Sequence, residues 1–107
     1  MIFEKLMSSA QRYNVSLEAL AVLGTKLRAD SEQLTIAPSL APLIDRVVEA
    51  LGFSPAELAA LPDQQRRAVA AMIRSFLRQA AEMLEQPEQA PGWSYHDAVI
   101  LQSQGRA

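Results

Sequence analysis

Apolar residues recur every three or four positions along most of the chain, which is the period of an α-helix with one buried face. Residues 2–12 predict a first amphipathic helix, and residues 16–29 a second one with Ser16 as its N-cap. The first stripe consists of Ile2, Phe3, Leu6, Met7 and Ala10, and the second of Leu17, Leu20, Ala21, Gly24 and Leu27.

The second helix is apolar around most of its circumference, because Val22 and Leu23 lie beside its main stripe. A helix of this kind has partners on two sides. It is therefore either the central helix of the domain or part of a subunit interface, and Val22 and Leu23 are the interface candidates.

A third helix is expected over residues 40–51, with Ser39 as its N-cap and with Pro42 tolerated in its first turn. Gly52 is expected to end it in the left-handed backbone conformation. Its predicted buried face consists of Leu40, Leu43, Ile44, Val47, Val48 and Leu51.

The segment FSPAEL, residues 53–58, is typical of a helix start. Ser54 can cap the helix, Pro55 suits its first position, and Glu57 can accept a hydrogen bond from the amide of the capping residue. Phe53 can also pack on Leu58 as a hydrophobic staple. This short helix is expected to end before Pro62.

Asp63 is the expected N-cap of the longest helix, which runs to about Gln86. Its predicted buried stripe is Val69, Met72, Ile73, Phe76, Leu77, Ala80, Met83 and Leu84. Residues 87–96, rich in Pro and Gly, are expected to form a linker. Residues 97–107 are expected to begin a further helix with Asp97 as its cap. The fold class is thus an all-α bundle of five to six helices over residues 1–86 and this last segment, without a sheet.

Composition excludes several classes of function. The 107 residues contain no Cys, which excludes disulfides and thiolate chemistry, and ten basic against twelve acidic residues argue against a nucleic-acid partner. The chain shows no signal peptide and no apolar run long enough for a membrane. A cytoplasmic protein without a membrane partner is expected.

Catalytic and metal sites find little support in the residues. His96 is the single histidine and has no second metal ligand near it, no serine lies in a Gly-x-Ser-x-Gly turn, and the four glycines are isolated. The Asp-Ser-Leu sequence expected of an acyl carrier does not occur in this chain. A helix-turn-helix drawn from residues 40–61 would present Glu57 to DNA, whose phosphates repel a carboxylate. No catalytic, metal-binding or cofactor-binding residue is therefore assigned.

The remaining candidates for chemistry are Trp93, Tyr95 and His96, which lie close together in the expected linker. The two aromatic rings could anchor the linker on the bundle, with His96 solvated or hydrogen-bonded. The functional alternative is that the three side chains line a substrate pocket shared with a following domain.

The ending PEQAPGWSYHDAVILQSQGRA, after a helix rich in Arg and Ala, resembles the N-terminal helical region of bacterial class I methyltransferases that use S-adenosylmethionine. The matching positions are Pro91, Gly92, Trp93, Asp97, Gln102, Gly105 and Ala107. The resemblance implies a lid and dimerisation module that precedes a catalytic domain absent from these residues. S-adenosylmethionine would be the cofactor of the full-length enzyme, and none is expected in this chain.

Two functions are consistent with these residues. The first is the substrate-lid and dimerisation module of a small-molecule methyltransferase, inactive alone, with a C-terminal catalytic domain or a second copy as partner. The second is a self-contained helical module for protein interaction or homodimerisation. Val99, Ile100 and Leu101 cannot all face one side of a helix, so they are further interface candidates.

Overall fold

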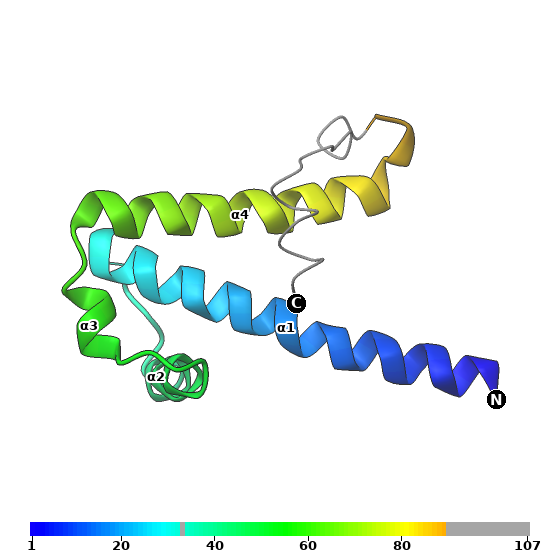
Figure 1. Cartoon of the computed structure of the whole chain (residues 1–107), viewed down its shortest axis with the longest axis horizontal. Helices are drawn as coiled ribbons and strands as arrows, with labels where there is room; N and C mark the ends of the chain where they lie inside the picture. The colour runs from blue at the N-terminus through cyan, green and yellow to red at the C-terminus, as the bar shows by residue number, and fades with distance from the viewer. Residues whose placement is uncertain (33, 90–107) are drawn as a thin grey trace. The chain divides into compact units, whose positions relative to one another are not determined.

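The structure, a computed structural model, describes residues 1–32 and 34–89, which contain four α-helices. These are α1 (Ile2–Glu32), α2 (Ala41–Ala50), α3 (Pro55–Ala59) and α4 (Asp63–Glu85), followed by one 3-10 turn, η1 (Pro87–Gln89) (Figure 1). No strand occurs in this part of the chain, so the prediction of an all-α fold is confirmed for it. The turn η1 falls at the start of the expected linker.

The expected break between the first two helices is wrong, because α1 is continuous across residues 12–16 and is the longest helix at 31 residues. No Pro or Gly interrupts this segment, and the Asn14 side chain donates to Glu18 Oε1 at 2.8 Å, one turn further on. Ser16 therefore lies inside the helix, where a serine is tolerated without acting as a cap. This fusion turns two expected helices into one, and the helix expected over residues 97–107 lies outside the described residues, which contain four α-helices.

Helix α2 begins differently from the prediction. Ser39 lies in a turn, the N-cap position belongs to Leu40, and no side chain caps the helix. The carbonyl of Ala37 accepts hydrogen bonds from the amides of Leu40 and Ala41, at 2.8 and 3.3 Å. Backbone groups thus take the place of the expected serine, while Pro42 does lie in the first turn.

The end of α2 and the start of α3 confirm the prediction. Gly52 has φ +96°, in the left-handed region, and its amide donates to Glu49 O, while the amide of Phe53 donates to Val48 O. These two bonds form a Schellman ending. The Ser54 amide then donates to Glu57 Oε1 at 2.8 Å and the Glu57 amide to Ser54 Oγ at 3.3 Å, which is the expected capping box.

The chain divides within α4 into two compact units, Met1–Arg74 and Ser75–Ala107. In the first unit, α2 and α3 lie at the C-terminal half of α1 (Figure 1). Among the described residues of the second, the C-terminal part of α4, from Ser75, is the only α-helix, with η1 after it.

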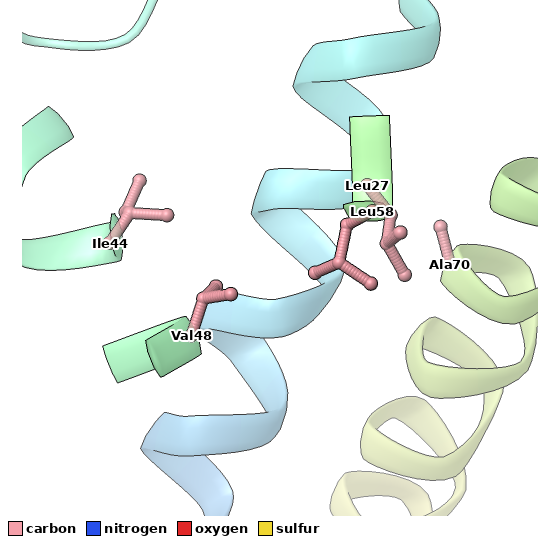
Figure 2. Packing of buried hydrophobic residues seen from close by; sticks show 5 residues of the cluster. All are labelled: Leu27, Ile44, Val48, Leu58 and Ala70. Carbon is pink, nitrogen blue, oxygen red and sulfur yellow. The ribbon is translucent and has the colours of Figure 1, made fainter. Parts of the chain in front are cut away.

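The core of the first unit is small and consists of side chains from all four helices. Leu27 of α1 and Val48 of α2 are exposed by only 2% and 0%, and Leu58 of α3 lies beside Leu27 (Figure 2). Ala70 adds the contribution of α4, and Ile44 adds a second residue from α2. Burial of the four larger side chains, Leu27, Ile44, Val48 and Leu58, contributes roughly 1.5–3 kcal/mol each.

The predicted faces of α2 and α4 are only partly buried. On α2, Ile44 and Val48 are buried, whereas Leu40, Leu43 and Leu51 are exposed. On α4, Ile73 is buried, and Ala70, which was not predicted, replaces Phe76 as a core residue. The prediction of a buried stripe is wrong for Met72, Phe76, Ala80, Met83 and Leu84. The periodicity shows which residues share a face, and the partner helix decides how many of them are covered.

Gly24 marks the close approach of α1 and α4. A Cβ atom at this position would lie 3.3 Å from Cγ2 of Ile73, so the glycine allows the two helices to meet there.

We predict that Gly24→Leu lowers the free energy of unfolding by about 1–3 kcal/mol, because the larger side chain overfills a packed contact. Urea unfolding measures this change. Ala21→Leu, on an exposed part of α1, is the matched control and should change stability by less than about 0.5 kcal/mol.

Candidate functional site

Arg66 connects three segments of the first unit, and its side chain is exposed by only 12%. Its Nε donates to Ser31 Oγ at the end of α1 at 3.0 Å, and its Nη1 donates to the carbonyls of Ala59 at 2.7 Å and Leu61. Its Nη2 lies 3.3 Å from Oδ1 of Asp63. The planar guanidinium thereby satisfies carbonyls that the short helix α3 and the following turn leave free.

Asp63 lies in the first turn of α4, and its carboxylate binds arginines, so its expected role as a side-chain cap is wrong. Arg67 Nε donates to Asp63 Oδ2 at 2.7 Å, and Arg67 Nη2 donates to Ser31 O at 2.9 Å. The Arg67 guanidinium is the main cause that lowers the pKa of the Asp63 carboxyl, and a hydrogen bond with Ser31 lowers it further. The start of α4 is thus joined to the end of α1 by charge-assisted hydrogen bonds.

A shallow pocket of about 210 Å³ lies next to these contacts. Arg28 Nε donates to Glu32 Oε2 at 2.8 Å, and this bond lowers the pKa of the Glu32 carboxyl, with smaller contributions from Arg67 and Arg74. The Arg74 side chain makes no hydrogen bond and no ion pair within the described ranges. The lining residues are Arg28, Ser31, Glu32, Arg67, Ala70, Ala71 and Arg74.

This pocket has no groups suited to catalysis. Its one carboxylate is held ionised by arginines, and a guanidinium does not exchange protons near neutral pH. No group of three or more metal-ligating side chains occurs in residues 1–32 and 34–89. Of the lining arginines, Arg67 joins α4 to α1 within the first unit, through its hydrogen bond to Ser31 O, whereas Arg28 pairs with Glu32 inside α1.

The most unusual surface of the described chain is the N-terminal half of α1. Residues 1–18 are all exposed, although Phe3, Leu6, Tyr13 and Leu17 are large and apolar or aromatic, with exposed fractions of 65, 64, 66 and 47%. Within the first unit, the other helices cover only the C-terminal half of α1 (Figure 1). We call the row Phe3, Leu6, Ala10, Tyr13 and Leu17 the N-terminal stripe.

The N-terminal stripe belongs to one unbroken heptad pattern. Spacings of three and four residues alternate without a gap along α1, which is the pattern of a helix that packs lengthwise on another helix. The pattern runs through Phe3, Leu6, Ala10, Tyr13, Leu17, Leu20, Gly24 and Leu27. The expectation of two separate helices hid this signal, although the residue spacing alone could have shown it.

An apolar groove of about 280 Å³ lies in the first unit where the N-terminal stripe ends. It lies between α1 and the segment that follows α2. Leu51 and Phe53 in this segment are exposed by 42 and 43%. The lining residues are Ser16, Ala19, Leu20, Leu23, Leu51 and Phe53.

The structure places two of the predicted interface residues. Val22 and Leu23 are half-buried and pack against the core of the first unit, and Leu23 also lines the apolar groove. The other candidates lie outside the described residues. They are the pocket candidates Trp93, Tyr95 and His96 and the interface candidates Val99, Ile100 and Leu101.

Comparisons with protein-family models, curated proteins and solved structures return no match for this chain. The positions that carry the methyltransferase resemblance, residues 91–107, also lie outside the described residues. That resemblance stays a prediction. Over residues 1–32 and 34–89, no helix combines the length and the apolar content needed to cross a membrane.

Replacement of Arg66 tests its role as a connection between helices. We predict that Arg66→Met lowers the free energy of unfolding by about 1–3 kcal/mol, because the carbonyls of Ala59 and Leu61 and the Asp63 carboxylate lose a buried partner. Arg46→Met removes a guanidinium from the exposed surface of α2 and should change stability by less than about 0.5 kcal/mol. Equal effects of the two variants in urea unfolding would contradict the assigned role.

The lowered carboxyl pKa values of Asp63 and Glu32 predict a loss of stability in acid. Each group has a lower pKa in the folded chain, so its contribution is present above the ordinary carboxyl pKa of about 4 and is lost as the pH falls through the folded value. Urea unfolding between about pH 6 and pH 2.5 should show this decline. The double variant Asp63→Asn with Glu32→Gln should flatten it, whereas Asp45→Asn, at an exposed position, should not.

Proposed function

We propose that the chain is a helical self-association module and that the N-terminal stripe of α1 is its contact surface. The observation that carries this proposal is the row of large apolar side chains, exposed in the protomer and spaced for lengthwise helix packing. Exposed apolar patches of this size on a folded unit are typical of interaction sites. The proposal is the homodimerisation function that the sequence left open as an alternative.

The size of the surface supports a stable dimer. An aromatic side chain presents ~150–250 Å² when fully exposed, and leucine, isoleucine and methionine somewhat less. With the exposed fractions of the stripe and of the flanking Ile2 and Met7, the surface amounts to on the order of 600–700 Å² per protomer, close to the ~800 Å² per partner of a standard interface.

The charge distribution supports pairing with a second copy of the same chain. The charged residues between positions 2 and 24 are Glu4, Lys5, Arg12 and Glu18. All four occupy the outer positions of the heptad, so the positions beside the stripe carry no charge. Two identical stripes can therefore approach each other without like-charge repulsion.

The stripe is also separate from the residues that stabilise the protomer. The core of the first unit uses Leu27, Ile44, Val48, Leu58 and Ala70, none of which belongs to the N-terminal stripe. Association can therefore be disrupted by substitution without loss of the fold, which makes the proposal testable on the intact chain.

The test is the oligomeric state of the whole chain by sedimentation equilibrium between about 1 and 100 μM. We predict a dimer for the unchanged chain. Leu6→Glu and Tyr13→Glu should each raise the dissociation constant at least ~100-fold, because dimerisation would bury two unpaired carboxylates, at a cost of several kcal/mol. Helix content by circular dichroism should stay the same, since both side chains are exposed in the protomer.

Matched controls are Ser8→Glu and Gln11→Glu, which add the same charge on the outer face of α1. They should leave the dissociation constant within about threefold. A monomer at 100 μM would contradict the proposal and would indicate that other residues of the same chain cover the stripe.

The methyltransferase prediction is compatible with this proposal, because it also includes dimerisation by a helical module. Its pocket residues Trp93, Tyr95 and His96 lie outside the described residues, and no observation in residues 1–32 and 34–89 bears on a methyl transfer. The proposed function therefore rests on α1 alone.

A further inference from the structure

We infer that two copies of the chain pair antiparallel along α1, and that Ile2 and Phe3 of each copy enter the apolar groove of the other. This inference rests on the proposed self-association and specifies its geometry. It joins two features of the first unit that lie apart on α1, the start of the helix and the groove lined by Leu20, Leu23, Leu51 and Phe53.

The direction follows from what already covers the heptad pattern. At Gly24 and Leu27 the pattern is occupied by α4, since Ile73 lies against Gly24 and Ala70 belongs to the cluster around Leu27. In a parallel pair, the partner's α1 would have to continue along these same positions and would meet α4. In an antiparallel pair, the N-terminal end of the partner's α1 lies toward Gly24. The partner's helix therefore ends before it reaches the positions that α4 covers.

The register follows from the heptad. Each heptad has two core positions, and in an antiparallel pair the first core position of one helix lies against the second core position of the other. This places Phe3 against the partner's Leu20 and Leu6 against the partner's Leu17. At the centre, Ala10 lies against the partner's Tyr13, so that a small side chain faces a large one. Every layer is then apolar and none holds two bulky rings.

The groove accounts for the end of this pairing. In the same register, Ile2 of one copy lies beside the partner's Leu23, and Phe3 lies beside the partner's Leu20, and both of these partner positions line the groove. Its volume of about 280 Å³ and its open side can accommodate an aromatic ring and a branched side chain. Leu51 and Phe53, exposed in the protomer, would become covered in the dimer.

The closing experiment uses disulfide formation, because the chain contains no cysteine of its own. Leu6→Cys and Leu17→Cys are purified separately, then oxidised alone and as an equimolar mixture. We expect a covalent dimer in the mixture only. The register brings the two positions opposite each other, within the ~4.4–6.8 Å between Cα atoms that a disulfide needs. The two Leu6 positions would lie about 16 Å apart along the helix axis.

The matched control is the pair Ser8→Cys and Val15→Cys. These positions lie at the same level along the antiparallel pair but on the outer face of α1, so their mixture should form no covalent dimer. Covalent dimers of Leu6→Cys alone and of Leu17→Cys alone would show a parallel pair, which overturns the inference and leaves the self-association intact. The absence of any dimer in sedimentation would overturn both.

A double-mutant cycle tests the groove. Phe3→Ala and Leu51→Ala should each weaken dimerisation, and the effect of the pair should differ from the product of the single effects by about tenfold, because the two side chains touch across the interface. Phe3→Ala with Leu43→Ala, an exposed residue of α2 outside the groove, should be additive. Additive behaviour of Phe3 with Leu51 would remove the groove from the interface.

Discussion

The arrangement of the first unit depends on the guanidinium of Arg66. Helix α3 has only five residues, so most of its carbonyls lack partners inside the helix, and a cluster of five buried apolar side chains alone would hold it weakly. Arg66 supplies donors to the carbonyls of Ala59 and Leu61 and, with the same planar group, reaches Ser31 and Asp63. The end of α1, the helix α3 and the start of α4 thereby share one set of hydrogen bonds. These bonds supplement a core that is too small to specify the positions of the helices by packing alone.

The two halves of α1 have different surroundings. The C-terminal half carries the partly buried ion pair Lys26–Asp30 and the more exposed pair Arg28–Glu32, and it buries Gly24 and Leu27 in the unit. The N-terminal half buries none of its side chains, although it has the same heptad spacing. A uniform pattern in the sequence thus corresponds to two environments. The division falls after residue 18, since Ala19 and Leu20 are the first half-buried residues of α1.

Sequence reasoning was sufficient where the signal is local and insufficient where the partners are distant. Gly52 and the Ser54–Glu57 capping box act within one turn of backbone, and the structure has both. Ser16, Ser39 and Asp63 look equally suitable as caps, but none of them acts as one. Ser16 lies inside the continuous helix α1, and a backbone carbonyl accepts at the start of α2 in place of Ser39. The Asp63 carboxylate binds two arginines. The contact of Arg66 with Ser31 spans 35 residues, so no local pattern could reveal it. The burial of Ala70 instead of Phe76 is a further case, since it depends on where α4 meets its neighbours.

The continuity of α1 has a consequence for the energetics of recognition. An isolated helix of about 16 residues is marginal in water, because the first turn fixes several dihedral angles for a single hydrogen bond. In this chain the packed half of α1 provides that first turn, and the exposed half only has to propagate from it. The stripe is therefore presented in an ordered form before any partner arrives, so that less conformational entropy is lost on association than for a segment that folds as it binds.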